Sequence, residues 1–105
     1  MFTEEEIVEI GRLIVAAINP EKIILFGSYA KGVATIRSDL DLMVVLQSNA
    51  PLGYRKEALM PILNRYVIKI DIHVYTPAEV EILQSEPYSF VKAVMETGRV
   101  CFERS

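Results

Sequence analysis

The stretch LFGSYAKGVATIRSDLDLMVV, residues 25–45, carries the most information about this chain. It starts apolar, breaks at Gly27-Ser28, passes through small and basic residues, and becomes apolar again around Asp39 and Asp41. Charged side chains are rarely buried in a core strand unless they have a partner. The two aspartates therefore need an explanation beyond the strand that carries them.

Alternation of side chains along a strand accounts for part of this pattern. In an extended segment Asp39 and Asp41 point to one face, while the leucine between them and every second residue after it point to the other. The strand rise separates the two aspartates by about 7 Å. Carboxylates this close repel and raise each other's pKa, and a divalent cation between them would remove that cost.

Asp71 repeats the pattern in residues 67–75, where isoleucine and valine alternate with polar residues. If this strand neighbours the strand at 39–46, three carboxylates converge on one patch. Carboxylate oxygens suit Mg²⁺ or Mn²⁺, and carboxylates around two metal ions support in-line displacement at phosphorus. Each aspartate alone would also fit a solvated strand end. His73 shares the face of Asp71, where a polar filler is a simpler interpretation than a metal ligand.

Gly27-Ser28 lies where a predicted strand becomes a short helix. A glycine there lets a phosphate approach the backbone, and a helix N-terminus offers free N–H groups. Ser28 is predicted to cap this helix. Lys31 and Arg37 follow in the connecting segment and could meet further phosphate charge. Taken alone, an ordinary turn with a serine cap explains Gly-Ser equally well.

The rest of the chain completes a pattern of alternating helices and strands. Thr3 with Glu6, and Thr76 with Glu79, each fit a capping box. Pro61 is expected to kink or divide the helix that contains it. The order predicts an α/β (α+β) fold, a small mixed sheet of three to four strands with helices packed mainly on one face. Helices are predicted over 3–18, 28–33, 53–66, from residue 76 and over 87–97, and strands over 22–26, 39–46, 67–75 and 100–102.

Composition bounds the class of protein. The 105 residues are 51% hydrophobic, so we expect a single domain over 1–105. Acidic and basic residues are mixed and no basic stripe occurs, so direct nucleic-acid binding is not expected. No apolar run reaches the roughly 18 residues of a membrane span, and the N-terminus is acidic where a signal peptide is basic. With Cys101 the only cysteine, we expect a cytoplasmic protein.

Two motifs match a known family. Phe26-Gly27-Ser28, followed after ten residues by Asp39-Leu40-Asp41-Leu42, resembles the signature of the nucleotidyltransferase superfamily related to DNA polymerase β. The chain is most similar to its minimal nucleotidyltransferase (MNT) domains, and the similarity covers nearly the whole length. Asp71 falls where the family carries its third carboxylate, and Lys31 stands where many relatives have arginine. The resemblance therefore implies the nucleotidyltransferase fold.

The resemblance also implies a reaction. Such an enzyme would transfer AMP from ATP to an acceptor hydroxyl with Mg²⁺, two ions being expected and Mn²⁺ an alternative. Asp39 and Asp41 would ligate metal, and Asp71 would ligate metal and help activate the acceptor. Gly27 and Ser28 would hold the outgoing phosphates.

The family further implies a partner. Many MNT domains act as antitoxins beside a HEPN-type toxin, and some transfer AMP to a tyrosine of that toxin. This chain has little sequence left for an acceptor domain, so a partner protein is expected to complete the acceptor site; a homo-oligomer is also allowed. Two alternatives stay open: a non-catalytic module that neutralises a toxin by contact, and a small-molecule nucleotidyltransferase of the aminoglycoside type.

Overall fold

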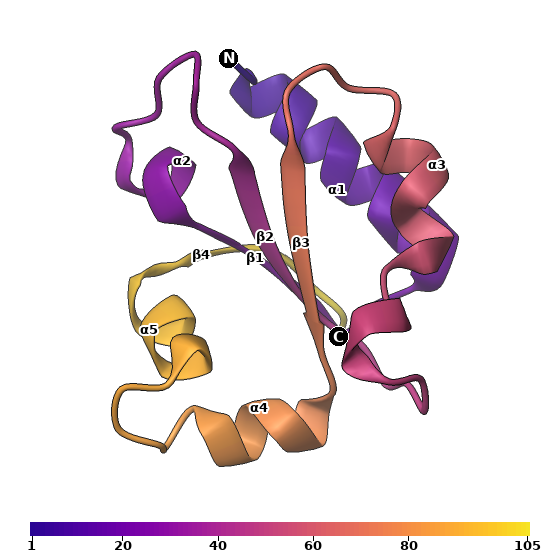
Figure 1. The fold of residues 1–105 in the computed structure, drawn as a ribbon, viewed down its shortest axis with the longest axis vertical. Coiled ribbons are helices and arrows are strands. Elements are labelled where there is room, and N and C mark those ends of the chain that lie inside the picture. Colours follow the sequence, from indigo (N-terminus) through magenta and orange to yellow (C-terminus); the bar gives the residue numbers. More distant parts are fainter.

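A computed structural model describes all of residues 1–105 and shows helices on both sides of one sheet (Figure 1). None of its helices is both long and apolar enough to cross a membrane. In chain order the elements are α1 (Glu4–Ile18), β1 (Lys22–Phe26), α2 (Gly27–Lys31), β2 (Leu40–Val45), the 3₁₀ turns η1 (Leu52–Tyr54) and η2 (Glu57–Leu59), α3 (Met60–Leu63), β3 (Ile70–Tyr75), α4 (Pro77–Leu83), α5 (Phe90–Thr97) and β4 (Arg99–Glu103).

The four strands form one sheet in the order β3-β2-β1-β4. β1 runs antiparallel to both β2 and β4, whereas β2 and β3 are parallel. A parallel pair needs a crossover connection, and here η1, η2 and α3 supply it. The predicted small mixed sheet is confirmed.

Helix α1 begins where the sequence predicts. The Thr3 hydroxyl accepts from the Glu6 N–H at 3.1 Å, and the Glu6 carboxylate accepts from the Thr3 N–H at 2.9 Å. This capping box satisfies two donors that the first turn leaves free. The helix then buries Ile7, Ile10 and Ile14.

Side chains of β2 alternate between two hydrophobic clusters. Leu42 and Val44 point into the larger cluster, beneath α1 and α3. Met43 and Val45 point the opposite way, toward residues of α4 and α5 that include Val91. Helices therefore cover both faces of the sheet, and the second face is covered more fully than the sequence predicted.

Two predicted helices differ from the structure. The single helix expected over 53–66 is wrong, because the segment forms η1, η2 and the one-turn helix α3. Pro61 lies in the first turn of α3, where its missing N–H costs nothing. The helix expected from residue 87 begins at Phe90. Its N-cap is Ser89, whose hydroxyl accepts from the Lys92 N–H at 3.0 Å, and Tyr88 before it has a φ of 65°.

Candidate active site

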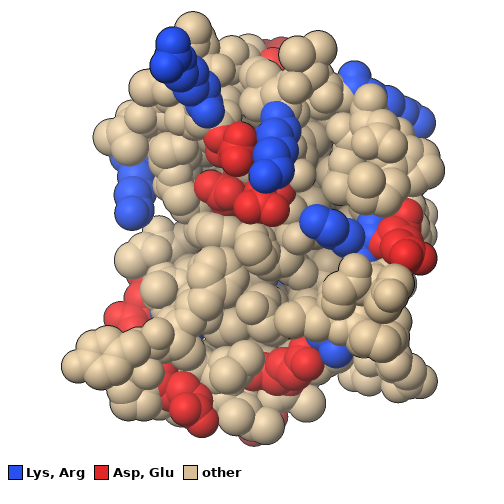
Figure 2. All heavy atoms as spheres, in the orientation of Figure 1, with Lys and Arg blue, Asp and Glu red and all other residues tan.

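The predicted carboxylates lie where three strands meet. Asp41 is opposite Phe26, the last residue of β1, and on its other side it is opposite Asp71 of β3. Figure 2 shows acidic side chains gathered in the upper half of this view, with basic side chains beside them. Alternation along both strands aims Asp41 and Asp71 at the same face of the sheet.

Gly27 lies against the Asp41 carboxylate in a backbone conformation that favours glycine. Its φ is 74°, a left-handed conformation that side chains disfavour. A Cβ at this position would lie 2.3 Å from Asp41 Oδ2. Glycine is therefore required twice, once by the backbone and once by the carboxylate that occupies the space of a side chain.

The predicted serine cap is wrong. Helix α2 begins at Gly27, and no side chain caps its N-terminal end. Ser28 thus lies inside the first turn. Because Gly27 already takes a helical hydrogen-bonding position, the chain turns one residue earlier than the sequence indicated.

The site holds excess negative charge. The pKa of Asp41 is raised, first by burial and then by the charges of Asp71 and Asp39, while His73 and Lys69 act in the opposite direction. Ionising all three carboxylates together therefore costs free energy. A cation or a hydrogen-bonding ligand would offset this cost.

Two basic side chains already approach the outer carboxylates. Lys69 Nζ lies 4.0 Å from Asp39 Oδ2, and His73 Nε2 lies 3.5 Å from Asp71 Oδ2. No three His, Cys, Asp or Glu side chains are close enough together to hold a metal ion. Carboxylate oxygens are the type of ligand that Mg²⁺ prefers. A cation bound here would stabilise the ionised form of Asp41, whose ionisation is unfavourable in the free chain. The three carboxylates would have to draw together around it.

The predicted phosphate-binding residues lie on α2 and the following loop. Lys31 ends α2, and its side chain is exposed and has no ion pair. Arg37 is also exposed and its guanidinium makes no ion pair; its backbone N–H donates to the Thr35 hydroxyl at 3.2 Å. The structure brings Gly27 against Asp41, but it does not bring these two basic side chains onto the carboxylates.

An aromatic cluster beside Asp71 was not predicted. His73 has its ring centroid 5.7 Å from that of Phe26 and 4.9 Å from that of Phe90. Alternation had placed His73 on the face of Asp71. No pattern in the sequence could bring Phe90 there, because it arrives from α5 through packing against the sheet.

Solved structures share this fold. A candidate nucleotidyltransferase from Sulfolobus solfataricus aligns with a TM-score of 0.65 at 18% identity, covering 93% of this chain and 78% of that one. A toxin–antitoxin complex solved with AMP-PNP contains a chain that aligns with a TM-score of 0.59 at 20% identity, covering 99% of this chain and 76% of that one. Both alignments show that this chain shares its fold with these structures, and the first places it in the nucleotidyltransferase fold.

The sequence assigns the family. Residues 8–100 match the nucleotidyltransferase domain family, and this chain belongs to it. A candidate protein adenylyltransferase of Methanocaldococcus jannaschii is 34% identical over 82 residues, which are 78% of this chain and 78% of the relative.

Proposed function

We propose that this chain is an Mg²⁺-dependent adenylyltransferase that transfers AMP from ATP to a hydroxyl of a partner protein. The observation that carries the proposal is the parallel pairing of Asp41 with Asp71, directly beside the left-handed Gly27. This arrangement sets two carboxylates and a glycine turn at one end of the sheet. A metal-bound triphosphate needs both features.

Each residue of the site has its own proposed role in binding the metal ion or the phosphates. Asp39, Asp41 and Asp71 would hold Mg²⁺, which neutralises phosphate charge and polarises the α-phosphate when bound. Gly27 and Ser28, at the start of α2, would bind the outgoing phosphates. Lys31 and Arg37, free of ion pairs, would swing onto the remaining phosphate oxygens.

In the transfer, the acceptor hydroxyl oxygen forms a bond to the α-phosphorus. The bond from that phosphorus to the bridging oxygen breaks, and pyrophosphate leaves. Asp71 orients the hydroxyl and takes up its proton. Positioning of this kind supplies most of the catalysis in phosphoryl chemistry.

The partner is proposed from the relatives. The name of the Methanocaldococcus jannaschii relative describes a protein adenylyltransferase, and one similar fold comes from a toxin–antitoxin complex with AMP-PNP, an ATP analogue. We therefore propose that the chain is the antitoxin of a HEPN/MNT pair and modifies its toxin. With a single cysteine, it would work in the reducing cytoplasm.

Labelled ATP tests this function directly. The chain is incubated with Mg²⁺, ATP labelled in the adenine and the HEPN-type protein encoded beside it. We expect label on the partner with the wild type and none with Asp41→Asn. Glu96→Gln, an acid-to-amide change at an exposed position of α5, serves as the matched control and should keep full transfer. Absence of label with the wild type would exclude the proposal.

One observation favours a second candidate, neutralisation by contact alone. Asp39 and Asp71 face Lys69 and His73, and the carboxylates are not gathered around a metal position. A contact-only antitoxin would still protect cells from the toxin when Asp39→Asn and Asp71→Asn are combined. The adenylyltransferase would lose protection in the same variant.

A further inference from the structure

A groove beside β3 adjoins the carboxylate site and takes no part in binding the metal ion or the phosphates. It has a volume of about 250 Å³ and lies between the outer edge of β3 and the crossover at Leu52–Lys56. Its strand side is formed by Ile72–Tyr75, which begins directly after Asp71. A pocket for a whole small molecule usually measures about 300–1,000 Å³, so this groove has the size of a subsite for part of a ligand.

The groove runs along the edge of the strand and not over one of its faces. Ile72 and Val74 turn their side chains into the larger hydrophobic cluster, where each is 4% exposed. His73 and Tyr75 point to the opposite face by alternation. All four residues line the groove. What Ile72 and Val74 present to it is therefore mainly their backbone.

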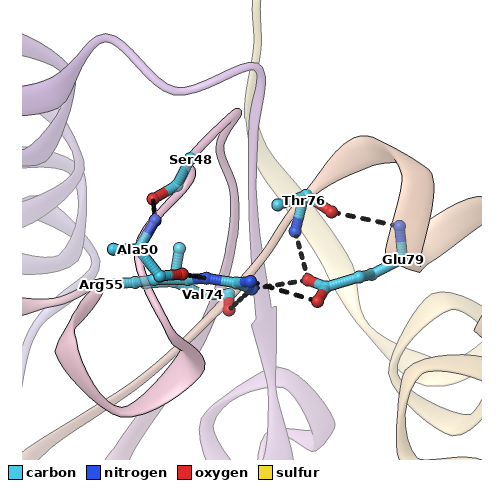
Figure 3. A network of polar contacts seen from close by, with 6 residues as sticks. All are labelled: Ser48, Ala50, Arg55, Val74, Thr76 and Glu79. Carbon is cyan, nitrogen blue, oxygen red and sulfur yellow. Dashed lines mark hydrogen bonds and ion pairs between the residues drawn. The ribbon is translucent and has the colours of Figure 1, made fainter.

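Two backbone groups at this edge have no partner. Carbonyls at the two ends of β3, those of Lys69 and Tyr75, accept from β2, so by alternation the N–H and C=O groups of Ile72 and Val74 point away from the sheet. The Arg55 guanidinium donates to the Val74 carbonyl at 3.3 Å (Figure 3). The Ile72 carbonyl and the Val74 N–H make no hydrogen bond within the chain. The groove thus presents an acceptor and a donor next to each other.

This pair of groups matches the edge of an adenine. Adenine carries a donor, its N6 amino group, beside an acceptor, its N1 nitrogen, which complement the Ile72 carbonyl and the Val74 N–H. Guanine has an acceptor at O6 and a donor at N1, so in the same placement each of its groups would meet a like group. A tyrosine of an acceptor protein ends in one hydroxyl and would leave one backbone group unpaired once water is displaced, which costs free energy.

Side chains of the groove suit the flat faces of a base. His73 and Tyr75 contribute aromatic rings, and Leu52 of η1 contributes an apolar side chain. Aromatic side chains stack on every base. The side chains would therefore supply affinity, while the strand edge would select the base.

We infer that this groove binds the adenine of ATP, with the N6 amino group donating to the Ile72 carbonyl and N1 accepting from the Val74 N–H. The inference rests on the proposed function, which assigns the phosphates to Gly27 and the metal to the carboxylates. Those carboxylates lie on β2 and β3, between Gly27 at the end of β1 and the groove outside β3. The nucleotide accordingly lies across the sheet, from its phosphates beside β1 to its base beyond β3.

Analogues of ATP test the two hydrogen bonds on the unmodified protein. Dissociation constants are measured by isothermal titration calorimetry in excess Mg²⁺. 1-Deaza-ATP lacks the N1 acceptor and N6,N6-dimethyl-ATP lacks the N6 donor, so we expect each to bind about fivefold more weakly than ATP. 7-Deaza-ATP alters an atom outside this pair and is the matched control, which should bind as ATP does. If neither of the first two analogues binds more weakly than 7-deaza-ATP, the inference is overturned.

A groove-filling variant tests the location of the base. Gly53 lines the groove, and a Cβ there would meet nothing within 4 Å, so Gly53→Phe adds a ring without a clash at the backbone. We expect it to weaken binding of ATP with Mg²⁺ about tenfold or more. Inorganic tripolyphosphate with Mg²⁺ has no base and should bind unchanged. Ala58→Phe adds the same ring at an exposed position outside the groove and should bind both ligands as the wild type does.

The two ligands separate this inference from the proposed function. A wild type that binds neither ATP nor tripolyphosphate in Mg²⁺ would exclude the proposed function and the inference with it. A wild type that binds both, together with a folded Gly53→Phe that keeps full affinity for ATP, would overturn the groove alone. Circular dichroism identifies a variant that does not fold, and the analogue series on the wild type then decides.

Discussion

At the residue scale, Gly27 disfavours a side chain both by its backbone conformation and by its contact with Asp41. Alanine there would take up a left-handed φ of 74° and place its Cβ 2.3 Å from Asp41 Oδ2. We expect Gly27→Ala to lower the free energy of unfolding by about 1–3 kcal/mol. Displacement of Asp41 should lower AMP transfer about 100-fold. Urea unfolding and the labelled-ATP assay measure the two effects.

Gly11→Ala is the matched control for Gly27→Ala. Gly11 lies inside α1, and a Cβ there would meet nothing within 4 Å. Alanine loses less chain entropy than glycine in a helix, so stability should rise by about 0.5–1 kcal/mol. Equal losses at both positions would mean that the contact with Asp41 is unimportant.

The charge of Asp41 has its own pH signature. A carboxyl whose pKa is raised on folding holds its proton more tightly in the folded chain, so its ionised form lowers stability at neutral pH. This cost shrinks as the pH falls through the folded pKa and is gone below the unfolded pKa. Asp41→Asn should therefore stabilise the free protein near neutral pH by up to about 1 kcal/mol.

Thermal melts across the acidic range check this sign. The advantage of Asp41→Asn over the wild type should shrink steadily as the pH is lowered, because both side chains are then uncharged. Glu57→Gln, at an exposed position without an ion pair, should show no such trend. A variant less stable than the wild type at neutral pH would contradict the prediction.

The sequence predicted which face of the sheet these carboxylates share, but it did not predict the contacts that they make. Alternation was enough to put Asp41 and Asp71 on one face, because a strand period of two needs no tertiary information. The contact between Gly27 and Asp41 was out of reach, since it depends on how β1 pairs with β2. The approach of Lys69 and His73 to the outer carboxylates likewise depends on side-chain conformation and register.

At the element scale, one ionic contact ties the crossover to α4 (Figure 3). Arg55 Nη1 and Nη2 donate to the two carboxylate oxygens of Glu79 at 2.5 and 3.2 Å. Arg55 also donates to the carbonyls of Ala50 and Val74. Glu79 in turn accepts from the Thr76 N–H at 2.8 Å, which completes the capping box of α4. A single guanidinium thus joins three segments of the chain.

This contact should make stability depend on acid pH. Hydrogen bonding by Arg55, with help from the Thr76 N–H, lowers the pKa of Glu79 from 4.5 to about 2. A depressed carboxyl pKa contributes stability above the unfolded pKa, and that contribution is lost as the pH falls toward the folded one. We expect Glu79→Gln to lose about 1 kcal/mol near neutral pH, a modest value because the Glu79 side chain is 37% exposed.

Unfolding curves from about pH 5 to pH 2 measure the effect. The wild type should lose stability over this range more steeply than Glu79→Gln. Glu57→Gln is a suitable control, because Glu57 is exposed and makes no ion pair. Parallel curves for wild type and Glu79→Gln would show that the contact contributes nothing.

Elements were predicted well where local signals agreed. The capping boxes at Thr3 and Thr76 identified the starts of α1 and α4, because capping is a contact between neighbours in sequence. The segment 53–66 failed, since its apolar pattern resembles one helix while the chain must turn to pass from β2 to β3. Arg55, which fastens this turn, gave no signal because its acceptors come from distant residues.

At the scale of the whole molecule, the excess negative charge of the site favours binding of a cation to the free chain. Its negative site combines a carboxyl of raised pKa with two carboxylates that face Lys69 and His73. ATP alone would add negative charge to this site. Mg²⁺ and ATP together add a cation that the carboxylates and the phosphates can share. Binding of the pair should therefore be strongly cooperative.

Thermal melts measure this cooperativity. With ligand at about 100 times its Kd, binding adds about 2.7 kcal/mol to the free energy of unfolding. We expect a clear rise in Tm with Mg²⁺ and ATP together, little with either alone, and reversal by EDTA. Asp71→Asn should lose most of the rise, and Glu96→Gln should keep it. The same rise with ATP alone would place the nucleotide away from the carboxylates, because at that site the uncompensated phosphates would be repelled.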